Sequence, residues 1–334
     1  MIEVRDLQKS FPVKETLFKA LITAFTGKQR FVRAVNGVSF TMQEGEIFGL
    51  AGESGCGKTT TCMLLLRLYT PSGGTIEFQG KDLKSLKGAE LSEFRRKAQL
   101  IFQDPYESLN PRFTVLRTIE EPLIVNKVRG KAQRRDRVLL AMARSRLTPV
   151  EEYIRKYPHE LSGGERQRVC IARAIVLEPS LLVADEAVSM LDVSIRASVL
   201  NLLRQLTEEM HMAALYISHD LSLLGSICDK IAIMYSGEIV EMGTPTEVIN
   251  APCHPYTKAL VAAVPVPEFY RREAKLASIT GEPPDLIDFP QGCPFQPRCE
   301  VAEDICFRKK PDLCETNQKH FVACHLHDAT VARG

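Results

Sequence analysis

The stretch Gly52-Glu53-Ser54-Gly55-Cys56-Gly57-Lys58-Thr59 decides the fold of this chain. Its spacing matches a phosphate-binding loop, in which glycines let backbone N–H groups point at phosphate oxygens. The apolar residues 47–51 before it predict a buried strand, and residues 59–69 after it predict a helix whose positive dipole end favours anions. A plain strand-to-helix turn is the alternative, but this pattern matches by chance in few chains of ordinary composition.

The loop assigns chemical roles to individual residues. Lys58 would reach the β and γ phosphates of a nucleotide, and Thr59 would ligate magnesium. The predicted nucleotide-binding residues of this segment are Gly52, Ser54, Gly55, Cys56, Gly57, Lys58, Thr59 and Thr60.

Further short apolar runs at residues 181–184 and 214–218 predict strands, and residues 193–210 between them predict a helix. Such alternation is typical of an α/β fold with a parallel sheet buried on both faces. Apolar runs on either side of Ser236-Gly237 predict a β-hairpin. Open α/β sheets bind ligands at the carboxyl ends of their strands, so Asp185 is a candidate magnesium ligand.

Composition excludes several classes of protein. The chain has 334 residues, 45% apolar and 25% charged, with a net charge of +2. These values exclude a disulfide-stapled miniprotein or a disordered chain, and they provide no global attraction to nucleic acid. The apolar runs are far shorter than the roughly 20 residues that span a bilayer. Because residues 1–6 lack the apolar core of a secretory signal, we expect a reducing cytosol, with cysteines as thiols or metal ligands.

Residues 161–167, Leu161-Ser162-Gly163-Gly164-Glu165-Arg166-Gln167, resemble the signature of ABC ATPases. In the same order, Gln103 resembles the Q-loop, residues 189–192 the D-loop and His219 the switch histidine. The resemblance implies a P-loop ABC ATPase core with a mostly parallel sheet, an antiparallel β subdomain and a helical subdomain at about residues 84–165.

The resemblance also implies how ATP is held and hydrolysed. Two ATPase domains would sandwich ATP, with the phosphate loop of one facing Ser162, Gly163 and Gly164 of the other. Glu186 would polarise the attacking water, His219 would contact the γ phosphate, and magnesium would be held by Thr59, Gln103 and Asp185.

An aromatic side chain should stack on the adenine ring. Phe11 is our candidate for this role, Phe31 competes with it, and core packing is the alternative for either.

Within ABC ATPases, residues 102–111 and 254–260 are similar to the dipeptide, oligopeptide and nickel importer group. An insert at residues 14–30 is similar to the F type of that group's two paired ATPase subunits. Ala187 stands where proline usually follows the catalytic glutamate, and Met190 replaces a common alanine of the D-loop.

Cysteines crowd the end of the chain, beyond a proline-rich approach, and place a boundary near residue 250. Residues 1–250 would form the nucleotide-binding domain and residues 251–334 a Cys-rich C-terminal region. Four cysteines fit the family's tail pattern and would bind an iron–sulfur cluster, of the 4Fe–4S type, namely Cys293, Cys299, Cys306 and Cys324. Zinc is the alternative, since the spacing excludes neither, and free thiols in a loop-rich region without metal are a third. Cys314 looks extra, and ATP binding should not depend on this separate region.

These features predict an ATPase subunit that powers import of dipeptides or oligopeptides. Its partners would be membrane permease subunits, a second ABC ATPase subunit, identical or different, and, indirectly, an extracytoplasmic peptide-binding protein. It would lie on the cytoplasmic face of the membrane.

Other functions remain open at this point. The same machinery could carry nickel or an oligosaccharide. A soluble ABC ATPase acting on nucleic acid or ribosomes usually has two ATPase domains or a long coiled coil, which this chain lacks. A GTPase is disfavoured because Asn126-Lys127 does not continue as the guanine-reading motif. The basic residues 95–97 and 129–135 lack interleaved aromatics, so we expect solvated helix faces and no nucleic-acid partner.

Overall fold

The computed structural model describes residues 2–13, 30–263, 281, 284, 286–287, 289–317 and 319–327. Apart from Arg30, the predicted insert at residues 14–30 lies outside these ranges. Among the described residues, no helix is both long and apolar enough to cross a bilayer.

The described part of the chain alternates strands and helices. The strands are β1 (Ile2–Pro12), β2 (Phe31–Met42), β3 (Ile47–Ala51), β4 (Gly73–Phe78), β5 (Lys81–Asp82), β6 (Ala98–Ile101), β7 (Leu181–Asp185), β8 (Ala213–Ile217), β9 (Lys230–Tyr235), β10 (Glu238–Gly243), β11 (Cys314–Asn317) and β12 (His320–Val322). The α-helices are α2 (Lys58–Leu65), α3 (Gly88–Lys97), α4 (Pro105–Ser108), α5 (Val115–Val125), α6 (Lys131–Arg144), α7 (Val150–Tyr153), α8 (Gly163–Ile175), α9 (Val193–Met210), α10 (Leu221–Ile227), α11 (Pro255–Ala263) and α12 (Asp304–Arg308).

The larger sheet has the order β11-β12-β10-β9-β3-β8-β7-β6. Strands β9, β3, β8, β7 and β6 run parallel, which confirms the strands predicted at residues 47–51, 181–184 and 214–218. β9 and β10 form the predicted antiparallel hairpin. The carboxyl ends of the parallel strands therefore meet at one edge of the sheet, where α/β proteins place their ligand sites.

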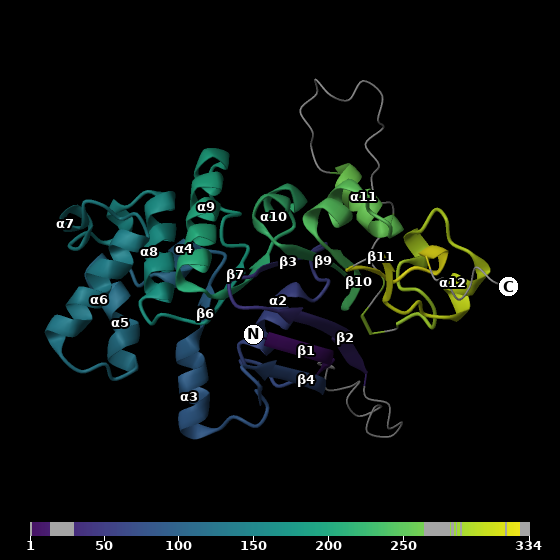
Figure 1. Cartoon of the computed structure of the whole chain (residues 1–334), viewed down its shortest axis with the longest axis horizontal. Coiled ribbons are helices and arrows are strands. Elements are labelled where there is room, and N and C mark those ends of the chain that lie inside the picture. The colour runs from purple at the N-terminus through teal and green to yellow at the C-terminus, as the bar shows by residue number, and fades with distance from the viewer. Residues whose placement is uncertain are drawn as a thin grey trace, which may run out of the picture.

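A smaller antiparallel sheet has the order β2-β1-β4-β5 and confirms the expected antiparallel subdomain. Its inward residues pack against one face of the larger sheet, as shown by Phe40 stacked on Phe48 with ring centroids 4.7 Å apart. Helix α2 belongs to the same hydrophobic cluster. In Figure 1, α2 lies between the two sheets.

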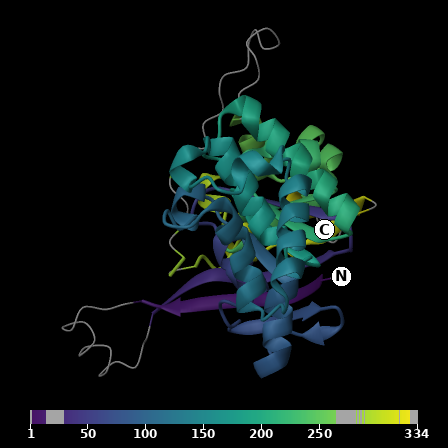
Figure 2. The ribbon, with the colours of Figure 1, turned by 90° about the vertical axis from the view of Figure 1, so that its left-hand side faces the viewer.

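The helices α5, α6 and α8 pack together around buried residues such as Ile119, Met142 and Ile171. In Figure 1 these helices lie at one end of the molecule, away from the C-terminal region, and in Figure 2 this end faces the viewer. The span of residues 84–165, expected to be helical, also contains β6, which pairs with β7. Four residues are too few to show a strand period beside long helices.

The described part of the C-terminal region shares its hydrophobic core with the rest of the chain. Strand β12 pairs with β10 and extends the larger sheet, and Cys293 and Phe295 belong to the hydrophobic cluster that contains Tyr235 and Tyr256. Described residues beyond 250 thus pack directly on the ATPase core. The predicted boundary near residue 250 stays a prediction.

Candidate active site

The phosphate-binding loop joins β3 to α2, as its motif requires. Gly57, immediately before α2, has φ 106°, and a Cβ there would lie 2.2 Å from the Ala34 carbonyl oxygen. A Cβ on Gly52 would lie 2.2 Å from the Met234 carbonyl oxygen. Both contacts are impossible, so these two positions require glycine.

A cavity of about 290 Å³ opens at this loop. Its lining residues are Ala34, Ser54, Gly55, Gly57, Lys58, Thr59, Thr60, Gln103, Asp185 and Glu186. The structure therefore brings most of the predicted phosphate-binding residues, the three predicted magnesium ligands and Glu186 to one cavity. Gly52, Cys56 and His219 do not line it. Ala34 also lines the cavity, and the sequence interpretation missed it. Its carbonyl lies against Gly57, a contact that no sequence motif indicates.

Lys58 is 6% exposed, and its ammonium donates hydrogen bonds to the carbonyl oxygens of Gly52 at 2.7 Å and Glu53 at 2.8 Å. The lysine thus links the two ends of the loop by hydrogen bonds. Phosphate oxygens could replace these carbonyl oxygens as its acceptors. Cys56 is also in the loop, but it is buried, and burial raises the pKa of its thiol. A neutral buried thiol contributes packing rather than charge.

Asp185 ends β7 beside Thr59. Burial raises the pKa of Asp185, the charge of Glu186 adds to this rise, and a hydrogen bond with Thr59 and the charge of Lys58 oppose it. A buried carboxylate flanked by another carboxylate is stabilised by a cation. This environment suits the predicted magnesium ligand pair Thr59 and Asp185.

Glu186 contacts Gln103 and His219, the residues that resemble the Q-loop glutamine and the switch histidine. Its Oε2 accepts a hydrogen bond from Gln103 Nε2 at 2.9 Å, and its Oε1 lies 3.2 Å from His219 Nδ1. Its backbone has φ 46°, which is unusual for a non-glycine residue and is fixed by a hydrogen bond from its N–H to the Ile217 carbonyl.

The signature residues lie outside this cavity. Ser162 caps α8, accepting a hydrogen bond from the Glu165 N–H at 3.3 Å, while the Glu165 carboxylate accepts one from the Ser162 N–H at 2.7 Å. Ser162, Gly163 and Gly164 do not line the cavity that contains Lys58. This helix start, whose predicted role is to bind phosphate, is therefore separate from the phosphate loop of its own chain.

Phe11, predicted to stack on adenine, is also absent from the cavity lining. Its ring packs edge-to-face on Tyr69 at 5.4 Å, with the Lys9 ammonium 5.0 Å from the ring centroid. Its adenine-stacking role stays a prediction.

The four tail cysteines line one common pocket, together with Phe295 and His254. Cys314, set aside from the ligand set, does not line it. Burial raises the pKa of Cys293 to about 12 and raises the pKa values of Cys299 and Cys324. Thiols in such surroundings ionise only beside a cation.

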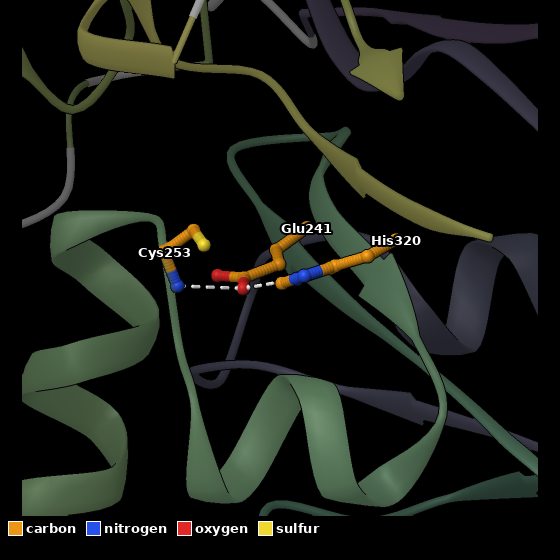
Figure 3. A group of neighbouring side chains, drawn as sticks. All are labelled: Glu241, Cys253 and His320. Carbon is orange, nitrogen blue, oxygen red and sulfur yellow. Dashed lines mark hydrogen bonds and ion pairs between the residues drawn. The ribbon is translucent and has the colours of Figure 1, made fainter. Parts of the chain in front are cut away.

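Glu241, Cys253 and His320 form a different group, shown in Figure 3. One possible ligand atom from each lies within 4.8 Å of the other two, and the described residues hold no other set of three this close. The Glu241 carboxylate accepts hydrogen bonds from the N–H groups of Cys253 and His254 and from His320 Nε2, at 2.8, 2.9 and 2.8 Å. These bonds already satisfy the carboxylate and occupy Nε2. The group is therefore a buried hydrogen-bonded junction between β10, β12 and the start of α11.

The fold and the site define an ABC-type ATPase. A phosphate-binding loop lies beside Asp185 and Glu186, Gln103 and His219 contact Glu186, and the signature helix is separate from this cavity. Residues 35–189 match the family model described as ABC transporter, and residues 240–306 match the oligopeptide/dipeptide transporter C-terminal region.

The chain is 43% identical to the oligopeptide transport ATP-binding protein AppF of Bacillus subtilis, over 98% of this chain and 97% of that protein. It is 41% identical to the dipeptide transport ATP-binding protein DppF of Escherichia coli, over 98% and 95%. The dimeric structure of MJ0796, a bacterial ABC transporter cassette, matches with a TM-score of 0.62 and 28% identity over 73% of this chain and 99% of that one. The chain belongs to the family of oligopeptide and dipeptide transport ATP-binding proteins.

Proposed function

We propose that this ATPase powers peptide uptake through a membrane permease, and that each ATP site is completed by a second ATPase subunit. The observation that carries the proposal is the separation of the signature helix from its own phosphate loop. Gly163 and Gly164 begin helix α8, and neither they nor Ser162 lines the cavity that contains Lys58. A bound γ phosphate would be stabilised by both helix starts only if another subunit supplied the second.

Hydrolysis then follows from the arrangement around Glu186. Thr59 and Asp185 would hold magnesium, which neutralises phosphate charge when bound. The Glu186 carboxylate would accept a hydrogen bond from the attacking water and polarise it. His219 would turn from this carboxylate towards the γ phosphate. Lys58 would exchange its carbonyl partners for phosphate oxygens.

The surface around the Q-loop suits a permease contact. Phe102 is 48% and Tyr106 61% exposed, and Gln103 between them contacts Glu186. A partner seated on these aromatic side chains would be connected to the catalytic carboxylate through a single residue. This placement supports a peripheral position on the cytoplasmic face of the membrane, with a peptide-binding protein delivering cargo on the other side.

The tail cysteines fit an iron–sulfur cluster better than one zinc ion. Zinc holds thiolates at about 2.3 Å, so four of them would crowd within a few ångströms of one another. Within the described chain, the close triad of ligand atoms is elsewhere, whereas Cys293, Cys299, Cys306 and Cys324 surround a shared pocket. A 4Fe–4S cluster spaces its thiolates more widely. Bound there, it would cross-link the segments that carry these four cysteines, one of which is helix α12.

The decisive test is reconstitution with the membrane permease that co-purifies with this chain and with a peptide-binding protein. Vesicles should take up a labelled peptide only with ATP on the side of this subunit. Glu186→Gln should stop uptake while ATP binding persists. Uptake of nickel or an oligosaccharide in place of peptide, or ATP turnover that ignores the permease, would overturn the proposal.

A further inference from the structure

Glu53, the second residue of the phosphate-binding loop, is held from three directions. Its N–H donates a hydrogen bond to the Tyr256 hydroxyl at 2.9 Å, and its carbonyl accepts one from Lys58 at 2.8 Å. Its carboxylate accepts two parallel hydrogen bonds from the Arg298 guanidinium, at 2.8 and 3.0 Å. One residue thus meets both the phosphate-binding lysine and the C-terminal region.

Arg298 is built into this position. Its side chain is 4% exposed, against 26% for Glu53, and it also donates to the Tyr235 hydroxyl at 3.3 Å. Tyr235, Tyr256 and Phe295 pack on one another with ring centroids 4.6 to 5.4 Å apart. A bidentate, buried arginine–carboxylate pair of this kind fixes both distance and orientation.

The cysteines bracket the residues that make these contacts. Phe295 and Arg298 lie between Cys293 and Cys299, and the Cys293 N–H donates to the Cys306 carbonyl at 2.8 Å. Whatever holds the cysteine loops together therefore also holds Arg298 against Glu53. The expectation that ATP binding is independent of this region does not fit these contacts, since the chain folds the two segments into one site.

We propose that Arg298 is a positioning residue for the phosphate-binding loop, and that the cysteine region sets ATP affinity through it. The second part rests on the proposed cysteine site, whereas the first rests only on the Arg298–Glu53 pair. Without Arg298, the Glu53 carboxylate is left half-buried and unpaired, one residue before Ser54 of the cavity lining. Its charge then repels the triphosphate, and the loop loses its anchor.

The test measures equilibrium binding of ATP with magnesium to the full chain by dialysis. Arg298→Ala should weaken binding about tenfold, the scale of one lost charge-assisted hydrogen bond. Arg298→Lys should lie between Arg298→Ala and the unmodified chain. Adding Glu53→Gln to Arg298→Ala should restore much of the affinity, because it removes the unpaired charge. Arg308→Ala, at an exposed arginine of the same region, is the matched control.

A merely structural role would lower the unfolding temperature without this charge-dependent rescue. Folded Arg298→Ala protein that binds ATP within twofold of the unmodified chain would overturn the role of Arg298, as would Glu53→Gln failing to rescue. Cys306→Ser should weaken ATP binding in the same direction, with no further loss when combined with Arg298→Ala. Unchanged affinity in Cys306→Ser would overturn the control by the cysteines. Metal content measured on the same samples shows separately whether the proposed cluster exists.

Discussion

Gln103 Nε2 donates a hydrogen bond to Glu186 Oε2 at 2.9 Å, across 83 positions of sequence. The amide and the carboxylate belong to different segments, since Gln103 follows β6 and Glu186 follows β7, two strands that pair in parallel. Neighbouring parallel strands bring their carboxyl ends together, so the sheet itself sets this contact. Movement of the Q-loop would therefore break or form a hydrogen bond to the carboxylate that we propose to be catalytic.

Glu186→Gln should bind ATP but hydrolyse it at least about 100-fold more slowly, because the amide keeps the shape of the side chain and loses its basicity. ATP should then accumulate a closed dimer, measured by size-exclusion chromatography and phosphate release. Glu178→Gln, at an exposed glutamate, is the control. Normal turnover in Glu186→Gln would remove Glu186 from its assigned role.

The affinity for magnesium with ATP should fall on mild acidification. Burial raises the pKa of Asp185, so a proton occupies this carboxylate at a higher pH than in an ordinary aspartate and competes with the metal. The stability of the metal-free chain should change in the opposite direction. It should fall as pH rises through the raised pKa of Asp185, because ionising a buried carboxylate costs free energy. A magnesium titration at several pH values checks the effect. Asp185→Asn should bind magnesium weakly at all of them, and an affinity that ignores pH in the unmodified chain contradicts the prediction.

Tyr106→Asp should uncouple transport from ATP binding. The ring is 61% exposed, with the Arg166 guanidinium 4.1 Å from its centroid, and we place it at the permease contact. Peptide uptake in vesicles should fall severalfold, while ATP affinity of the subunit stays within about twofold, as is usual for surface substitutions. Phe307→Asp, at an exposed aromatic in the C-terminal region, is the control. Parallel loss of both activities would mean that the loop is structural within this chain.

The cysteine site predicts a clear division between variants. Protein purified without oxygen should be brown and contain about four iron and four sulfide per chain. Cys306→Ser should lose the cluster, whereas Cys314→Ser should retain it because Cys314 lies outside the shared pocket. Colourless protein with about one zinc per chain would show that the site holds zinc and no cluster. Protein without metal would refute the site.

His320→Ala should destabilise the chain by about 1–3 kcal/mol, the usual cost of leaving a buried acceptor without its donor. His320 is 3% and Glu241 0% exposed, so water cannot easily take the place of the lost donor. Denaturant unfolding measures the change in unfolding free energy, and exposed Asp312→Ala is the comparison. Equal stability of the two variants would show that the junction is dispensable.

Much of the nucleotide site was predictable because its residues sit in contiguous motifs. The loop at residues 52–59 and the strand ending at Asp185 each carry a local pattern, and parallel strands bring such patterns together without further information. The close approach of Ala34 to Gly57 depends on how the smaller sheet packs, which leaves no local pattern.

The contact between Arg298 and Glu53 could not be predicted from spacing. It joins positions 245 residues apart, and a glutamate within a phosphate-binding loop is an ordinary variable position. Proline and cysteine patterns suggested a separate region at the tail, since they show no helix or strand period. The burial of Phe295 against Tyr235 and Tyr256, which attaches that region, is a matter of tertiary packing alone.

The pairing of β12 with β10 also covers the edge of β10. Glu241 and Met242 of β10 pair with Val322 and Phe321, and without that partner β10 would become an edge strand with unpaired backbone groups beside buried Ile239 and Val240. Exposed apolar edges recruit strands from other molecules. Truncation near residue 250 should therefore yield a chain that aggregates, and the tail acts as a cover that keeps the sheet from growing between molecules.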